Sequence, residues 1–159
     1  MTRLLLAIGI VLTLGASATL QTRPDFSGTW QLDEERSISP TYAGFVGPVV
    51  WVVTQTPDTM TVEIHRRERA YTIAFALADK PFTTPAGKTP SYRGYWDGES
   101  LRTESTQEIE GQTVITREVR SLKNDGREMI VERIVQVEHG YNVRGGRSYG
   151  SGRDTFVKK

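Results

Sequence analysis

Glycine-centred turns between alternating runs restrict much of this chain to antiparallel β-strands. Asp97-Gly98, Glu110-Gly111 and Asp125-Gly126 are pairs that suit the positive φ angles of tight hairpin turns. The runs between and after these turns are rich in threonine and valine, which favour strands over helices. They predict a meander of long strands joined by short turns, at residues 101–109, 113–122 and 128–137.

The same alternation precedes the meander. Before it we expect four strands, at residues 49–55, 60–65, 71–77 and 92–96. Prolines at residues 38–48 and 79–91 predict two long loops, either of which could rim an opening. Glycines predict a loose segment over residues 139–152, followed by a short last strand at residues 155–157. With the first strand this gives roughly eight to ten strands, and a sheet of that length tends to close or to split into two layers.

The N-terminus has the features of a removable leader. Arg3 precedes the apolar run Leu4–Leu14, and Ala16-Ser17-Ala18 is a small-x-small pattern that predicts cleavage before Thr19. The apolar run is shorter than the ~20 residues that span a bilayer, so we expect no stable membrane span after cleavage. The expected organisation is a signal peptide at 1–18, a flexible lead-in at 19–25 and one β-barrel domain at 26–159, in a secreted or periplasmic protein.

Charge and composition exclude several classes of function. The chain has 20 basic and 19 acidic residues, and loss of Arg3 with the leader balances them, so no global field draws in nucleic acid. It has no cysteine, which removes disulfides and thiol chemistry. Its two histidines, His65 and His139, are far apart in sequence, and it contains neither a phosphate-binding glycine loop nor a Gly-x-Ser-x-Gly elbow. We therefore predict no metal, no cofactor, no catalytic residues and no enzyme.

The first strand carries an unusual inward face. In an extended chain Phe26, Gly28 and Trp30 point to the same side. Gly28 leaves room for a close approach, and Trp30 brings a large apolar ring whose N–H needs a partner when buried. We expect Gly28 and Trp30 to plug one end of a barrel.

The segment Phe26-Ser27-Gly28-Thr29-Trp30, followed by a long loop and a meander, resembles the first strand of lipocalin and fatty-acid-binding (calycin) barrels. The layout is most similar to small secreted bacterial lipocalin-like proteins of undefined activity. The resemblance implies an all-β, single antiparallel up-and-down β-barrel. In lipocalins a basic side chain from a late strand covers the tryptophan, and Arg153 is the nearest candidate for that role here.

Such a barrel implies a small apolar or amphipathic ligand, including one that bears a carboxylate. The aromatic residues expected to line its cavity are Trp51, Phe75, Tyr92 and Trp96. Arg117 and Arg133 either face the cavity, where they could pair with a carboxylate, or lie along an outer face. The sequence leaves both arrangements open.

Two other functions stay open. A barrel filled with side chains would favour a structural or interaction protein of the cell envelope, whose protein partner the sequence does not identify. An enzyme built in the barrel mouth is the third alternative, and it would show a strongly shifted carboxyl or histidine pKa inside a pocket.

Overall fold

The computed structural model describes residues 23–39, 47–83, 90–138 and 147–159, and only the backbone of residues 147 and 148. The expected leader at 1–18 lies outside the described residues, as do parts of both proline-rich loops and the segment around His139. No helix in the described part of the chain has the length and apolarity needed to cross a membrane.

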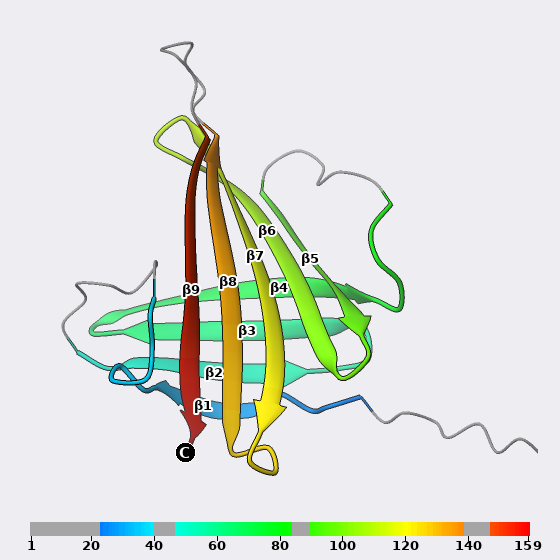
Figure 1. Cartoon of the computed structure of the whole chain (residues 1–159), viewed down its shortest axis with the longest axis vertical. Coiled ribbons are helices and arrows are strands. Elements are labelled where there is room, and N and C mark those ends of the chain that lie inside the picture. Colours follow the sequence, from blue (N-terminus) through cyan, green and yellow to red (C-terminus); the bar gives the residue numbers. More distant parts are fainter. Residues whose placement is uncertain (1–22, 40–46, 84–89, 139–146) are drawn as a thin grey trace, which may run out of the picture.

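The described residues form nine strands in one closed barrel, in sequence order around the wall (Figure 1). The all-β barrel predicted from the sequence is therefore confirmed. The strands are β1 (Gly28–Leu32), β2 (Val49–Gln55), β3 (Thr59–Arg66), β4 (Arg69–Ala78), β5 (Ser91–Asp97), β6 (Ser100–Ile109), β7 (Gln112–Lys123), β8 (Glu128–Glu138) and β9 (Arg147–Lys158).

The hairpin turns lie where the glycines predicted them. Gly98, Gly111 and Gly126 all have positive φ angles, of 61°, 75° and 77°. Consecutive strands from β5 to β9 pair antiparallel, and β9 returns to pair with β1.

One pair departs from the predicted up-and-down barrel, because β4 and β5 run parallel. Only Ala76, Leu77 and Ala78 pair, with residues 93–95 of β5. Parallel neighbours need a connection of about a dozen residues, and the proline-rich segment 79–90 is long enough to supply it. The barrel is thus mixed rather than purely antiparallel.

The last strand is longer than the sequence suggested. β9 begins at Arg147 instead of Thr155 and pairs with β8 along its length, so residues 147–154 are not a loose segment. Glycine has no strand preference of its own. The backbone pairing with β8 therefore determines the extended conformation of Gly150 and Gly152.

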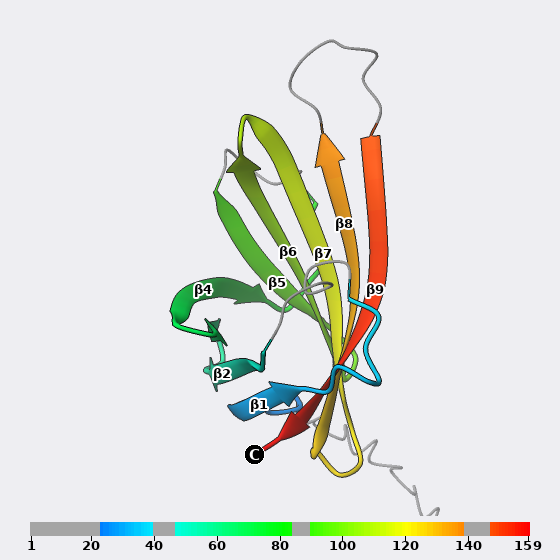
Figure 2. The same cartoon turned by 90° about the vertical axis from the view of Figure 1, so that its left-hand side faces the viewer.

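Strands β5–β9 cross strands β1–β4 and extend beyond them (Figures 1 and 2). Where the two sets overlap, the inward-facing side chains form one core. Its largest buried members come from both sets and include Trp30, Trp51, Met60, Leu101, Met129 and Phe156. Trp51 and Phe156 join the sets directly, with ring centroids 4.3 Å apart.

Trp30 lies at the crossing of the first and last strands. It is fully buried, and its indole N–H donates to the Phe26 carbonyl at 2.8 Å. The Lys158 ammonium lies 5.1 Å from the indole ring centre, so the basic cover comes from Lys158 and not from Arg153. Gly28 has a φ of 136°, and a Cβ there would lie 2.7 Å from Lys158 Cε. The glycine two residues before the tryptophan therefore makes room for the lysine stem.

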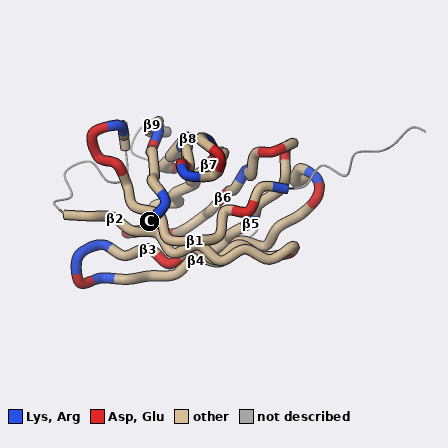
Figure 3. The backbone as a smooth tube through the Cα atoms, turned by 90° about the horizontal axis from the view of Figure 1, so that it is seen from below, with Lys and Arg blue, Asp and Glu red and all other residues tan. Residues whose placement is uncertain are grey.

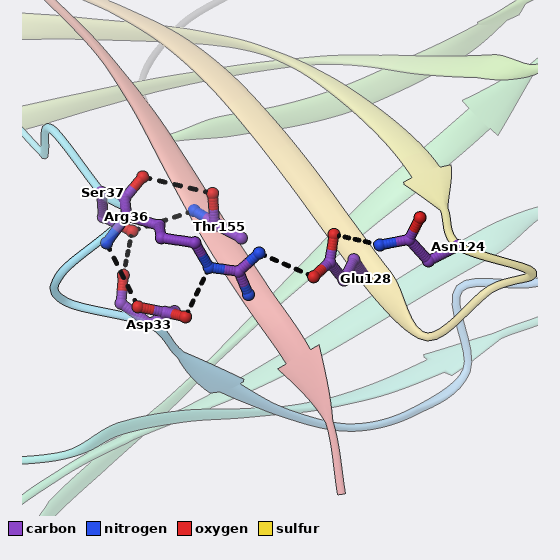
Figure 4. A network of polar contacts seen from close by, with 6 residues as sticks. All are labelled: Asp33, Arg36, Ser37, Asn124, Glu128 and Thr155. Carbon is purple, nitrogen blue, oxygen red and sulfur yellow. Dashed lines mark hydrogen bonds and ion pairs between the residues drawn. The ribbon is translucent and has the colours of Figure 1, made fainter.

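A polar clasp fixes the segment after β1 to the outside of the barrel (Figure 4). Arg36 forms ion pairs of 2.7 Å with both Asp33 and Glu128, the first residue of β8. The Ser37 hydroxyl accepts from the Thr155 N–H at 2.9 Å, and Ile38 exchanges two 2.8 Å main-chain hydrogen bonds with Arg153. The clasp fixes the start of the first long loop against β8 and β9.

Candidate ligand-binding site

Four buried charged residues form a chain across β7, β8 and β9, which we call the charge cluster: Glu118, Arg120, Arg133 and Asp154. Arg120 and Arg133 both donate to the Glu118 carboxylate, Arg133 through Nε at 2.7 Å. Arg133 also donates to Asp154 Oδ2 at 2.6 Å. All four point inward, because Glu118 lies opposite Arg133, and both Arg120 and Asp154 lie opposite the core residue Val131.

The two carboxyl groups of the charge cluster have opposite pKa shifts. Burial raises the pKa of Glu118, but the Arg120 and Arg133 guanidiniums outweigh it and hold the pKa at about 2. Burial also raises the pKa of Asp154, and there the Arg133 guanidinium and the Ser39 hydroxyl only partly offset it. Glu118 is therefore the ionised carboxylate on which the cluster is built.

The charge cluster rests on the aromatic core. The Arg120 guanidinium carbon lies 5.4 Å from the Trp51 ring centre and 5.0 Å from that of Phe75, and its Nη1 is 3.4 Å from Met60 Sδ. Cation–π contacts of this kind stabilise a buried guanidinium. Side chains thus fill the barrel up to the charge cluster.

Beyond the charge cluster the interior changes character. Farther from the β7–β8 turn, several inward-facing apolar side chains keep accessible surface, and Tyr71 is 39% exposed. The strand registers place all of them on the same face as the core residues. We call this set the inner apolar surface: Tyr71, Ile73, Tyr92, Val114, Val135 and Val137.

A pocket of about 710 Å³ lies at one end of β2, β3 and β4. This mouth pocket is lined by residues 47–49, Arg66, Arg67, Glu68, Arg69 and Tyr71. Register places Arg66 opposite both Val49 and Arg69, so all three occupy inward-facing positions. Arg66 donates to the Tyr71 hydroxyl at 3.0 Å, and the basic hairpin end is visible in Figure 3. Three arginines and one glutamate make the pocket electropositive.

A second hollow of about 750 Å³, the outer groove, runs across the outer face of β5–β9. Phe82 lies at its β5 side and the exposed Ile38 at its β9 side. Glu104 at its floor pairs with Arg93 at 2.6 Å and with Arg117 at 2.8 Å. Most of its lining residues alternate with those of the interior, so the groove is a feature of the barrel's exterior.

The structure distributes the predicted ligand-binding residues over three environments. Trp51 and Phe75 lie in the filled core under Arg120, and Trp96 packs on Phe26 with ring centroids 6.2 Å apart. Tyr92 alone among the four aromatic residues belongs to the inner apolar surface.

The two predicted arginines lie on opposite faces. Arg133 points inward but is held by Glu118 and Asp154. Arg117 is half exposed on the outer face, where it pairs with Glu104, so it does not line the interior. Their sequence separation is even, but the β7–β8 turn between them sets a register that pairs Arg117 with Ile134 and Arg133 with Glu118.

Sequence reasoning missed the charge cluster and the mouth pocket. Glu118 and Arg120 share a strand face with the apolar Val114. This pattern indicates that two opposite charges could pair inside the barrel. In the sequence alone, the Arg66-Arg67-Glu68-Arg69 stretch is typical of a charged hairpin end and gives no sign of a pocket. Its pocket arises because Val49 and Tyr71 flank it in space.

No group of metal-ligating side chains occurs in the described ranges, and His65 pairs there with Glu63 at 2.9 Å.

Comparisons with known proteins place the fold. No protein-family model and no curated protein matches the chain. Apo lipid binding protein 8 of Caenorhabditis elegans is 13% identical, with 84% of this chain and 95% of that chain covered and a TM-score of 0.52. A mutant of the REP1-NXSQ fatty acid transporter is also 13% identical, with 84% and 98% covered and a TM-score of 0.51. At this identity the likeness shows the fold alone. The chain thus shares a closed β-barrel fold with these two proteins.

Proposed function

We propose that this protein binds a small amphipathic molecule, with the apolar part of the ligand against the inner apolar surface. The observation that carries the proposal is the contrast between the two parts of the interior. Most inward-facing side chains up to the charge cluster are fully buried, although Leu122 is only partly so. Ile73 and Tyr92, which pack against the core, and Val135 keep accessible surface beyond it. Inward-facing apolar surface left accessible in a barrel is what a ligand can cover.

Two solved structures with this fold support the proposal through their names, which describe a fatty acid transporter and a lipid binding protein. The protein would act as a carrier or binding protein rather than an enzyme. The leader-like sequence at residues 1–18 supports export to the periplasm or the medium.

The proposal is tested by native mass spectrometry of the protein purified from its own host, followed by organic extraction of any bound molecule. We expect a non-covalent adduct of one amphipathic ligand per chain. Val135→Asp should abolish the adduct, and Ile134→Asp, on the outward-facing neighbour, should keep it. Two negative results together would contradict the proposal. They are the absence of any adduct, and the absence of apolar fluorescent-probe binding that is weakened by Val135→Asp.

An interaction protein of the envelope is the second candidate, and the outer groove favours it. Ile38 is 78% exposed although the clasp fixes its backbone, and Ile134 on the groove floor is 50% exposed. Rigidly presented apolar side chains of this kind are typical of interaction sites. Crosslinking in the native host separates the candidates, because Ile38→Asp should remove a specific protein partner only if the groove binds one.

A further inference from the structure

We propose that the mouth pocket holds the anionic head group of the ligand, and that the buried Arg120 and Arg133 take no part in binding it. The ligand would then lie with its head at the mouth and its chain directed inward along the inner apolar surface. This inference rests on the proposed function and specifies the class and orientation of the ligand.

The interior guanidiniums already have built-in carboxylate partners. Glu118 accepts from both Arg120 and Arg133, and Arg133 also donates to Asp154. A ligand carboxylate could reach these arginines only by displacing Glu118 or Asp154, either of which would remain buried without its partner. Leaving a buried charge unpaired is among the most unfavourable changes in a protein interior. The charge cluster therefore excludes a second carboxylate.

The mouth pocket has the opposite balance of charge. Arg66 and Arg69 occupy inward-facing positions, and Arg67 adds a third guanidinium at the turn. Among the described residues that line the pocket, Glu68 is the one acid. Guanidinium groups form charge-assisted hydrogen bonds with carboxylates and phosphates. The pocket thus offers an anion net attraction that the interior does not.

The mouth pocket and the inner apolar surface share a residue. Tyr71 lines the pocket, receives the Arg66 hydrogen bond and is followed on the same face of β4 by Ile73. Val49, which also lines the pocket, belongs to the hydrophobic core. An amphiphile anchored at the arginines can therefore place its chain on apolar side chains without crossing a charged one.

The test compares three single-chain probes of equal length, a carboxylate, a phosphate monoester and an alcohol, by isothermal titration with the full chain. The wild type should bind both anions about ten-fold more tightly than the alcohol, with a preference that weakens at high salt. Arg66→Gln/Arg69→Gln should bind all three probes alike. Arg67 is left unchanged because its φ of 52° is part of the hairpin turn.

Two further variants separate the inference from a folding defect. Glu68→Gln removes the one acid of the pocket and should tighten anion binding two- to three-fold, a gain that misfolding cannot mimic. Arg153→Gln, in the outer groove, should leave all affinities unchanged.

Binding of all probes with no effect of the mouth variants would overturn the inference and leave the proposed function standing. Binding of no probe, the alcohol included, would overturn the proposed function itself. Loss of anion binding in Arg153→Gln alone would place the site in the outer groove. Sedimentation with anionic vesicles, without saturable binding of any single probe, would assign the arginines to a membrane surface and contradict the inference.

Discussion

Replacing Glu118 by glutamine should destabilise the barrel in a way that depends on pH. A carboxyl group whose pKa falls from an ordinary value of 4.5 to about 2 on folding stabilises the folded state by about 3 kcal/mol while it is ionised. Because the folded pKa is the lower one, this stabilisation is complete above pH 4.5 and is lost as the pH falls toward 2. At pH 3 about 1.4 kcal/mol of it should remain.

The assay is urea unfolding followed by tryptophan fluorescence at pH 7 and at pH 3. The difference in unfolding free energy between wild type and Glu118→Gln should narrow by about 2 kcal/mol from pH 7 to pH 3. The same comparison in an Asp154→Asn background removes the second carboxyl group of the charge cluster. Glu132→Gln, on the exposed face of β8, is the matched control and should show no such change.

A difference in unfolding free energy between wild type and Glu118→Gln that is equal at both pH values would refute the reasoning. It would mean that Glu118 is not the carboxylate held ionised between Arg120 and Arg133.

Three other changes test separate parts of the structure. Asp154→Asn should gain stability relative to wild type as the pH rises above 4, since burial raises the folded pKa of Asp154 and its ionisation opposes folding. Urea unfolding from pH 3 to 8 checks this, and a difference in unfolding free energy that does not change with pH counts against it. Gly28→Ala should cost about 1–3 kcal/mol in thermal unfolding, because of its φ of 136° and the clash with Lys158, whereas Gly98→Asn, at φ 61° with open space around it, should cost little. Lys158→Met keeps the stem and loses the ammonium over Trp30, which should cost about 0.5 kcal/mol; a loss as large as that of Gly28→Ala would mean that the stem contributes little.

The sequence contained enough to predict a β-barrel because its strands and turns are local signals. Asp97-Gly98 and Glu110-Gly111 set hairpins through backbone conformation alone, and the alternation around them needs no tertiary information. β9 was underestimated because Gly150 and Gly152 carry no local preference, and only the β8 ladder determines their conformation.

The site was harder to predict because it depends on register and on pairing across strands. Arg117 and Arg133 could not be assigned to a face until the β7–β8 turn fixed their partners as Ile134 and Glu118. Likewise, three arginines within four positions at Arg66–Arg69 become a pocket only where β2 brings Val49 against them. Periodicity finds the inward face of a strand, but not which charges meet there.

The most direct test of a barrel that is filled below the charge cluster and open beyond it is methyl NMR during titration with the long-chain carboxylate. We predict chemical-shift changes at Ile73, Val135 and Val137, and none at Val53 or Leu101 in the filled core. Changes confined to Val119 and Ile134, which line the outer groove, would contradict the account.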